Sequence, residues 1–101
     1  MHGVIYKITN TINGKYYIGS TVDFKKRKYT HTWKLNKGIH HSVYLQNAWN
    51  LYGASNFRFE ILYESFDIKT DEQKELDALD WTNVYNISRT ATRWRHCAIT
   101  S

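Results

Sequence analysis

Residues 4–20 have the sequence VIYKITNTINGKYYIGS. The opening VIYKI combines β-branched and aromatic residues, a composition that is typical of a strand. In the middle, Asn13-Gly14 is a strong signal for a hairpin turn, and the closing KYYIGS predicts the returning strand. We therefore expect a β-hairpin that places Tyr6 and Tyr17 on neighbouring strands.

Two helices are predicted after the hairpin. The first is expected to begin after Asp23, a favourable N-cap residue, and to end before Gly38. The second is expected to begin after Ser42 and to end at Gly53. Its apolar residues follow the spacing of one helix face: Leu45, Ala48, Trp49 and Tyr52. This second helix is therefore predicted to be mainly a packing element.

A third strand is predicted over residues 56–64, with side chains alternating between two faces. One face should hold Phe57, Phe59, Ile61 and Tyr63, and the other Arg58, Glu60 and Glu64. The sequence TDEQ, which begins at Thr70, is a capping box and predicts the start of a third helix. The order ββααβα favours an α+β fold: a three-stranded, mainly antiparallel sheet flanked by helices.

Composition limits the classes of protein that fit. A chain of 101 residues with 42% apolar and 16% aromatic residues suits one domain with a modest core. The single cysteine, Cys97, excludes an intrachain disulfide framework and a cysteine-based zinc site. No apolar run approaches the ~20 residues of a membrane span, and the N-terminus lacks a signal-peptide core. We expect a soluble, intracellular protein with no membrane partner.

The net charge of +5 is unevenly distributed. Seven basic residues and no acid lie between Phe24 and Phe59, whereas eight acids lie between Glu60 and Asp80. This separation predicts one positive surface, for which nucleic acid is the first candidate partner and a solvated face without a partner is the alternative. The expected nucleic-acid-binding residues are Lys25, Lys26, Lys28, Lys34, Lys37, Arg89, Arg93 and Arg95.

Several motifs together resemble the GIY-YIG nucleases. Val4-Ile5-Tyr6 and, ten residues later, Tyr17-Ile18-Gly19 resemble the paired strand motif of that family. The family also has an arginine ten residues after the second motif tyrosine, a histidine or tyrosine one turn later, a glutamate on the third helix and an asparagine near the end. The matching residues are Arg27, His31, Glu75 and Asn86.

The resemblance covers about residues 3–88. The segments HSVYLQNAWN and FRFEIL are similar to the homing-endonuclease branch of the family. Two departures stand out. The first glycine of the family motif is replaced by Val4, with Gly3 one residue earlier, and the stretch between Glu75 and Asn86 is short. The second departure leaves Glu72 as a rival to Glu75.

The resemblance implies a metal-dependent endonuclease that hydrolyses a phosphodiester bond of double-stranded DNA and leaves a 5′-phosphate and a 3′-hydroxyl. It implies Mg²⁺ or Mn²⁺ as cofactor, with one ion per site. We expect a nuclease domain in residues 1–88. Residues 89–101 would be a basic tail, either the start of a linker or a DNA-contacting segment. Dimerisation on DNA is left open, and a phage- or intron-encoded enzyme would act in the host cytoplasm.

Chemical roles can be suggested for the charged members of this set. Arg27 has a planar, permanently charged fork of donors that suits the scissile phosphate, and a general DNA-backbone contact is its alternative role. Glu75 is expected to hold the divalent cation, with water and phosphate oxygens completing its shell. Glu72 remains the alternative ligand.

The chemical roles of the tyrosines and histidines are harder to assign. A free tyrosine has a pKa near ~10 and is a poor base unless its surroundings lower that pKa. The resemblance implies that one tyrosine activates water. We assign this role to Tyr6, and phosphate positioning or proton relay to Tyr17, although the two roles could be exchanged. His31 is expected to donate to the phosphate or relay a proton. His40 should support the site, and Asn86 should fix its geometry.

Two other functions remain open on the sequence. A non-catalytic nucleic-acid-binding module could use the same basic surface, but it would not need an acid facing a phosphate. A strand transferase with a tyrosine nucleophile would form a covalent adduct with DNA, and the resemblance argues against it.

Overall fold

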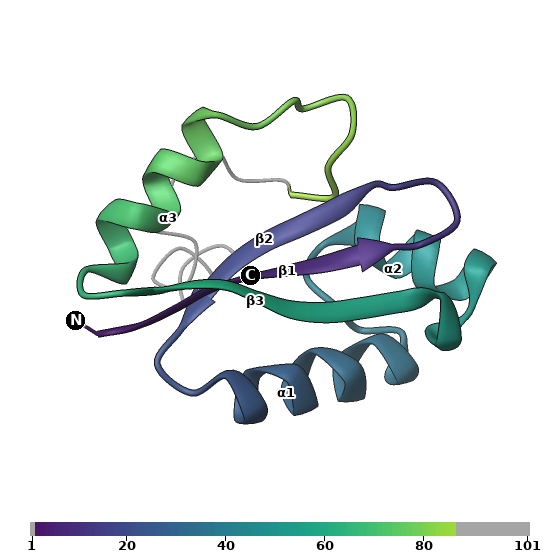
Figure 1. The fold of residues 1–101 in the computed structure, drawn as a ribbon. Coiled ribbons are helices and arrows are strands. Elements are labelled where there is room, and N and C mark those ends of the chain that lie inside the picture. Colours follow the sequence, from purple (N-terminus) through teal and green to yellow (C-terminus); the bar gives the residue numbers. More distant parts are fainter. Residues whose placement is uncertain (1, 87–101) are drawn as a thin grey trace.

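The computed structural model describes residues 2–86 (Figure 1). Its sheet has the order β2-β1-β3: the central strand β1 (Gly3–Asn10) pairs antiparallel with β2 (Tyr16–Thr21) on one edge and with β3 (Phe57–Ser65) on the other. The predicted ββααβα order and α+β class are confirmed. The predicted tail, with Arg89, Arg93 and Arg95, lies outside the described residues.

The hairpin forms as its sequence predicts. Gly14 has a φ of 78°, and its N–H donates to the Asn10 carbonyl at 2.8 Å. This left-handed conformation favours glycine because it has no Cβ. The register pairs Tyr6 with Gly19 and Ile8 with Tyr17. Since paired residues face the same side of a sheet, Tyr6 and Tyr17 lie diagonally on one face.

Helices α1 (Phe24–Lys37) and α2 (Val43–Tyr52) cover the tyrosine face of the sheet. Their caps are those predicted. Asp23 accepts from the Lys26 N–H, Ser42 accepts from the Leu45 N–H, and Gly38 closes α1 in the left-handed conformation. A short 3₁₀ turn, η1 (Ala54–Asn56), then leads into β3. The buried cluster joins both helices to the sheet and contains Tyr6, Ile8, Tyr17, Leu35, Leu45, Ala48, Trp49 and Tyr85.

Helix α3 (Ile68–Asp77) covers the opposite face, above the sheet in Figure 1. The predicted start at Thr70 is wrong by about one turn. Asp67 is the N-cap, and its carboxylate accepts from both the N–H and the hydroxyl of Thr70. The capping box therefore lies inside the helix, which moves Glu72 from the first turn into the second.

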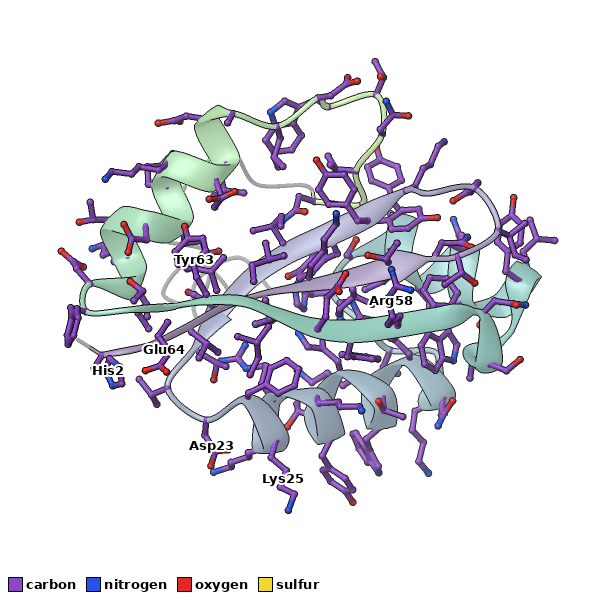
Figure 2. The ribbon with its side chains drawn as sticks, viewed as in Figure 1. His2, Asp23, Lys25, Arg58, Tyr63 and Glu64 are labelled. Atoms are coloured by element: carbon purple, nitrogen blue, oxygen red, sulfur yellow. The ribbon has the colours of Figure 1, made fainter. Side chains whose placement is uncertain are left out.

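The predicted alternation of β3 is wrong at its C-terminal end. The pairing with β1 shifts between Ile5 and Tyr6, so that Ile5 pairs with Tyr63 but Tyr6 pairs with Ile61. A bulge adds one residue to a strand and reverses the facing of everything beyond it. Tyr63 accordingly points towards α3, and Glu64 points to the other side (Figure 2).

Within residues 2–86, none of the helices combines the length and the apolar character needed to span a bilayer.

Candidate active site

The two motif tyrosines lie in the core, with only 1% of Tyr6 and 2% of Tyr17 exposed. The Tyr6 ring crosses directly over Gly19 of β2, and a Cβ at Gly19 would overlap its hydroxyl and ring. The absence of a side chain at Gly19 is therefore what lets the Tyr6 hydroxyl reach the edge of the sheet. The next two residues of β2, Ser20 and Thr21, line a surface pocket.

A chain of hydrogen bonds runs from Tyr6 into the protein. The Tyr6 hydroxyl lies 2.6 Å from Nε2 of His31, and Nδ1 of His31 lies 2.7 Å from Nε2 of His40. His40 is fixed in turn, because its Nδ1 accepts from the Ser42 N–H at 3.0 Å and its own N–H donates to Gln46 at 3.1 Å. The sequence predicted His31 and His40 as site residues, and the structure connects both to Tyr6.

The backbone bond to His40 determines the direction of this chain. Burial, together with the positive charges of His41 and Lys34, lowers the pKa of His40 from 6.5 to about 3, so its ring is neutral. Its Nδ1 accepts, and its single proton is therefore on Nε2 and points to His31 Nδ1. A neutral His31 ring would then carry its proton on Nε2 and donate it to the Tyr6 oxygen.

Tyr17 has a separate histidine partner. Its hydroxyl lies 3.0 Å from Nε2 of His41, which is exposed. The His41 ring stacks on His40 with centroids 4.4 Å apart, and His40 stacks on His31 at 4.9 Å. Tyr6 is thus linked to the buried histidines His31 and His40, whereas Tyr17 contacts the solvent-exposed His41.

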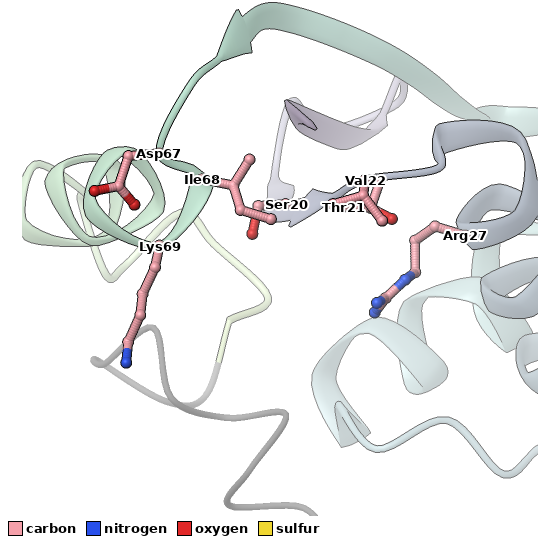
Figure 3. A pocket seen from close by; sticks show the side chains of 7 residues that line it. All are labelled: Ser20, Thr21, Val22, Arg27, Asp67, Ile68 and Lys69. Carbon is pink, nitrogen blue, oxygen red and sulfur yellow. The ribbon is translucent and has the colours of Figure 1, made fainter. Parts of the chain in front are cut away.

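Arg27 lines the pocket that begins at Ser20 and Thr21. The pocket has a volume of about 460 Å³ and lies between the end of β2, the start of α1 and the start of α3 (Figure 3). Arg27 enters it from α1, opposite Asp67 and Lys69 at the start of α3. Arg27 is half-buried, which limits its side chain to few orientations.

The two candidate glutamates lie in different places. Glu72 is buried, with 1% of its surface exposed, and its Oε1 accepts a hydrogen bond from the hydroxyl of Ser20, a pocket residue. Glu75 lies further along α3 and accepts a hydrogen bond from the Tyr63 hydroxyl at 2.8 Å. Tyr63 belongs to β3, the edge strand on the other side of β1. The structure therefore connects Glu72, and not Glu75, to a residue that lines the Arg27 pocket.

The position of Tyr63 against α3 changes the pKa of its phenol. Burial, reinforced by the hydrogen bond to Glu75 and by the negative charges of Glu75 and Asp71, raises the pKa of Tyr63 to about 12. The carboxylate of Glu75 is thereby engaged with a neutral phenol on the sheet.

Asn86 closes the outer edge of β2. Its amide makes two hydrogen bonds of 2.8 Å with the backbone of Ile18, accepting from the N–H and donating to the carbonyl. The neighbouring Tyr85 N–H donates to the Tyr16 carbonyl at 2.7 Å. Asn86 is therefore hydrogen-bonded to the backbone of β2 between Tyr17 and Gly19.

The basic residues of α1 separate into groups. Lys26 and Lys34 line a groove beside Arg27. Lys28 extends over the Phe59 ring of β3, 5.6 Å from its centroid, and Lys37 lies 5.7 Å from the Trp33 ring centroid. Lys25 points away from the sheet (Figure 2).

The donor set near the pocket fits a hard divalent cation bound mainly by water. Within residues 2–86 no three His, Cys, Asp or Glu side chains are grouped to enclose a metal. Glu72 offers a carboxylate that is hydrogen-bonded to the pocket residue Ser20, and Ser20 contributes a neutral hydroxyl. Mg²⁺ retains several waters and binds proteins through one or two carboxylates plus substrate phosphates. A single glutamate is therefore sufficient for such an ion once a phosphate completes the shell.

Residues 2–86 match the model of the GIY-YIG catalytic domain. The chain belongs to the GIY-YIG family. The predicted family is thus confirmed, and Tyr6, Tyr17 and Gly19 are its paired strand motif. One curated relative is "Intron-associated endonuclease 1" of Enterobacteria phage T4, which is 45% identical over 94 residues. That match covers 87% of this chain but 38% of the relative, so the chain spans well under half of its length.

Two solved structures share this GIY-YIG fold. A mutant of the catalytic domain of intron endonuclease I-TevI matches with a TM-score of 0.79 and 37% identity, over 89% of this chain and 97% of that one. The catalytic domain of homing endonuclease I-TevI matches with a TM-score of 0.77 and 37% identity, over 85% of this chain and 98% of that one. The predicted similarity to the homing-endonuclease branch is confirmed.

Sequence reasoning missed several members of this GIY-YIG site. His41 was not predicted as a site residue, and the supporting roles of Ser42 and Gln46 in holding His40 were not foreseen. The pair His40-His41 was a usable signal, because adjacent residues in a loop can contact two different partners. No spacing rule would have linked Ser20 to Glu72, which are 52 residues apart.

Proposed function

We propose that this domain is a metal-dependent endonuclease that hydrolyses a phosphodiester bond of double-stranded DNA. The main support is the position of Arg27, which lines a pocket together with Ser20. Ser20 donates to Glu72 and directly follows Gly19, the glycine under the Tyr6 ring. A permanent cation in the pocket, with a phenol and a carboxylate one residue behind its wall, suits a phosphate whose negative charge rises during hydrolysis. The names of the endonuclease relatives support the same reaction.

Arg27 binds the scissile phosphate. Its planar fork donates to two phosphate oxygens at once and stabilises the charge that accumulates in the transition state. Because Arg27 is half-buried at the pocket rim, these hydrogen bonds form in a partly desolvated place, where they are stronger than in bulk water.

Glu72 is the residue that holds the divalent cation, in preference to the predicted Glu75. It is buried against a pocket residue, whereas Glu75 is engaged with Tyr63. The cation, Mg²⁺ or Mn²⁺ and one per site, supplies Lewis-acid stabilisation of the phosphate and of the leaving oxygen. Ser20, which lines the pocket, orients the Glu72 carboxylate through its hydroxyl.

Tyr6 would act as a phenolate: its own phenol proton first passes to solvent water, and the phenolate oxygen then accepts the proton of the attacking water. The His31 Nε2–H donates to the Tyr6 oxygen, and a donor at that oxygen favours the phenolate that forms when the phenol proton is lost. Water approaches Tyr6 from the pocket, because Ser20 and Thr21, the pocket residues of β2, directly follow the glycine under its hydroxyl. Tyr17, paired with the exposed His41, positions the phosphate or relays a proton to solvent.

The products would be a 5′-phosphate and a 3′-hydroxyl. One active site cuts one strand at a time, so a double-strand break needs two successive nicks or a second copy of the domain. A DNA substrate places the reaction inside the cell that contains the target.

The test is cleavage of supercoiled plasmid at low salt and high enzyme concentration, with Mg²⁺ or with a chelator. We expect nicked circles with Mg²⁺ only, and at least ~100-fold less nicking by Arg27→Ala. Arg58→Ala is the matched control, because Arg58 is exposed on β3, outside the lining of the Arg27 pocket, and forms an ion pair with Glu60 at 3.8 Å. Salt-sensitive binding without cleavage under any divalent metal would instead support a binding module. A DNA adduct on a denaturing gel would support a strand transferase.

A further inference from the structure

A second hollow lies next to the Arg27 pocket, along one side of α1. It has a volume of about 560 Å³ and shares Thr21, Val22 and Arg27 with the first pocket. Arg27 therefore stands between the two cavities, and a strand whose phosphate is held by Arg27 would continue into the second one.

The wall of this second groove is a row of residues one helical turn apart. Lys26, Thr30 and Lys34 recur every four residues and so share one side of α1. From Lys26 to Lys34 the helix rises by ~12 Å, and successive phosphates of one strand are separated by ~3.4 Å along the duplex axis. The row is thus long enough to contact about three successive phosphates.

The residue between the two lysines of the groove, Thr30, has a short side chain that leaves space for a ligand. The Thr30 hydroxyl donates to the Lys26 carbonyl at 3.0 Å, which keeps this short side chain against the helix. Lys34 is half-buried, and its charge contributes to the lowered pKa of His40, which places it close to the Tyr6 chain. One acid, Asp23, also lines the groove, but its carboxylate is used to cap the Lys26 N–H.

We propose that the groove lined by Lys26, Thr30 and Lys34 is a binding site for the DNA phosphates that adjoin the scissile phosphate on the same strand. The inference rests on the proposed function, because it takes Arg27 as the ligand of the scissile phosphate. It divides the lysines of α1 into two classes. Lys26 and Lys34 bind the strand being cut, and Lys25 and Lys28 do not, since Lys25 points away from the sheet and Lys28 lies over Phe59.

The test compares two double variants with the same loss of charge: Lys26→Gln/Lys34→Gln and Lys25→Gln/Lys28→Gln. Their affinity for a fluorescent DNA duplex is measured over a range of salt concentrations without divalent metal, so that no cleavage occurs. Each lost phosphate contact lowers the slope of log affinity against log salt by ~0.9. We expect the first variant to lose ~2 in slope and to bind ~10- to 100-fold more weakly at ~0.1 M salt. The second should keep the wild-type slope.

Equal losses in the two variants would overturn the proposal, because affinity would then depend on net charge and not on the groove. An unchanged slope in Lys26→Gln/Lys34→Gln would overturn it as well. Plasmid nicking by the wild-type domain separates this inference from the proposed function. If the wild-type domain never nicks plasmid, but DNA binding is weakened only in Lys26→Gln/Lys34→Gln, the phosphate-binding groove is supported and the proposed endonuclease reaction is not.

Discussion

Nε2 of His40 lies 2.7 Å from Nδ1 of His31, and the two rings stack with centroids 4.9 Å apart. The Ser42 N–H fixes the far side of His40. A backbone N–H can only donate a hydrogen bond. The hydrogen bonds from Ser42 through His40 and His31 are therefore all donated in the direction of Tyr6.

This direction can be observed in the histidine tautomers. We predict that the rings of His40 and His31 both have their proton on Nε2 in the folded protein. Nitrogen-15 NMR of the imidazoles near neutral pH distinguishes the two tautomers. A proton on Nδ1 of either ring would contradict the proposed direction, because Tyr6 would then have to donate to His31.

The stability of the domain should depend on His40. Its pKa is near 6.5 in the unfolded chain and about 3 in the folded protein, so between these values the unfolded state binds more protons. Stability is therefore complete above pH ~6.5 and falls as the pH drops towards 3, by at most ~1.4 kcal/mol per pH unit. Urea unfolding between pH 7 and 5, a window above the usual carboxylate pKa values, should show this slope.

The control for this prediction is His40→Gln, which lacks the titrating ring. Its free energy of unfolding should vary less with pH than that of the wild type over the same window. Parallel curves for the two proteins would assign the slope to His31 or His41, which also lie in this stack.

Gly19→Ala tests the close contact beneath Tyr6. The added methyl overlaps the Tyr6 hydroxyl and ring, and the packed core around Tyr6 leaves little room for it to move. Overpacking of this kind costs ~1–3 kcal/mol. We expect that loss in urea unfolding, together with reduced plasmid nicking. A variant with wild-type stability would show that Tyr6 can move without cost.

Asn86→Asp tests the support of β2. The aspartate keeps an acceptor for the Ile18 N–H but loses the donor to the Ile18 carbonyl and places a carboxylate against it. Leaving a buried carbonyl without its donor costs ~1–3 kcal/mol. We expect lower stability and faster hydrogen exchange of the Ile18 amide. Unchanged exchange would mean that the edge of β2 is held by the Tyr16 and Tyr85 contact instead.

The hairpin and the first two helices could be predicted because their signals are local. Asn13-Gly14, Asp23, Ser42 and Gly38 each act within a few residues, and each does so in the structure. The start of α3 was wrong because two local caps compete, and Asp67 is the one that satisfies Thr70. The facing of Tyr63 was wrong because a bulge depends on pairing with a distant strand.

The site residues can be divided in the same way, into those that could be predicted from the sequence and those that depend on contacts between distant residues. Tyr6, Arg27 and His31 were found from spacing, because family spacing reflects positions on neighbouring elements. The choice between Glu72 and Glu75 could not be made in this way. It depends on which side of α3 faces β2, and the contact between Glu72 and Ser20 joins residues that are 52 positions apart. The bulge that turns Tyr63 towards α3 also provides the partner that occupies Glu75.

The most direct measurement of the central claim is Mg²⁺-dependent plasmid nicking by Glu72→Gln and Glu75→Gln, two variants with the same chemical change on one helix. If Glu72 holds the metal at the Arg27 pocket, Glu72→Gln should lose nicking at least ~100-fold, while Glu75→Gln should stay within a few-fold of the wild type. Circular dichroism and urea unfolding confirm that both variants are folded. Loss of nicking in a folded Glu75→Gln, with Glu72→Gln active, would contradict the site described above.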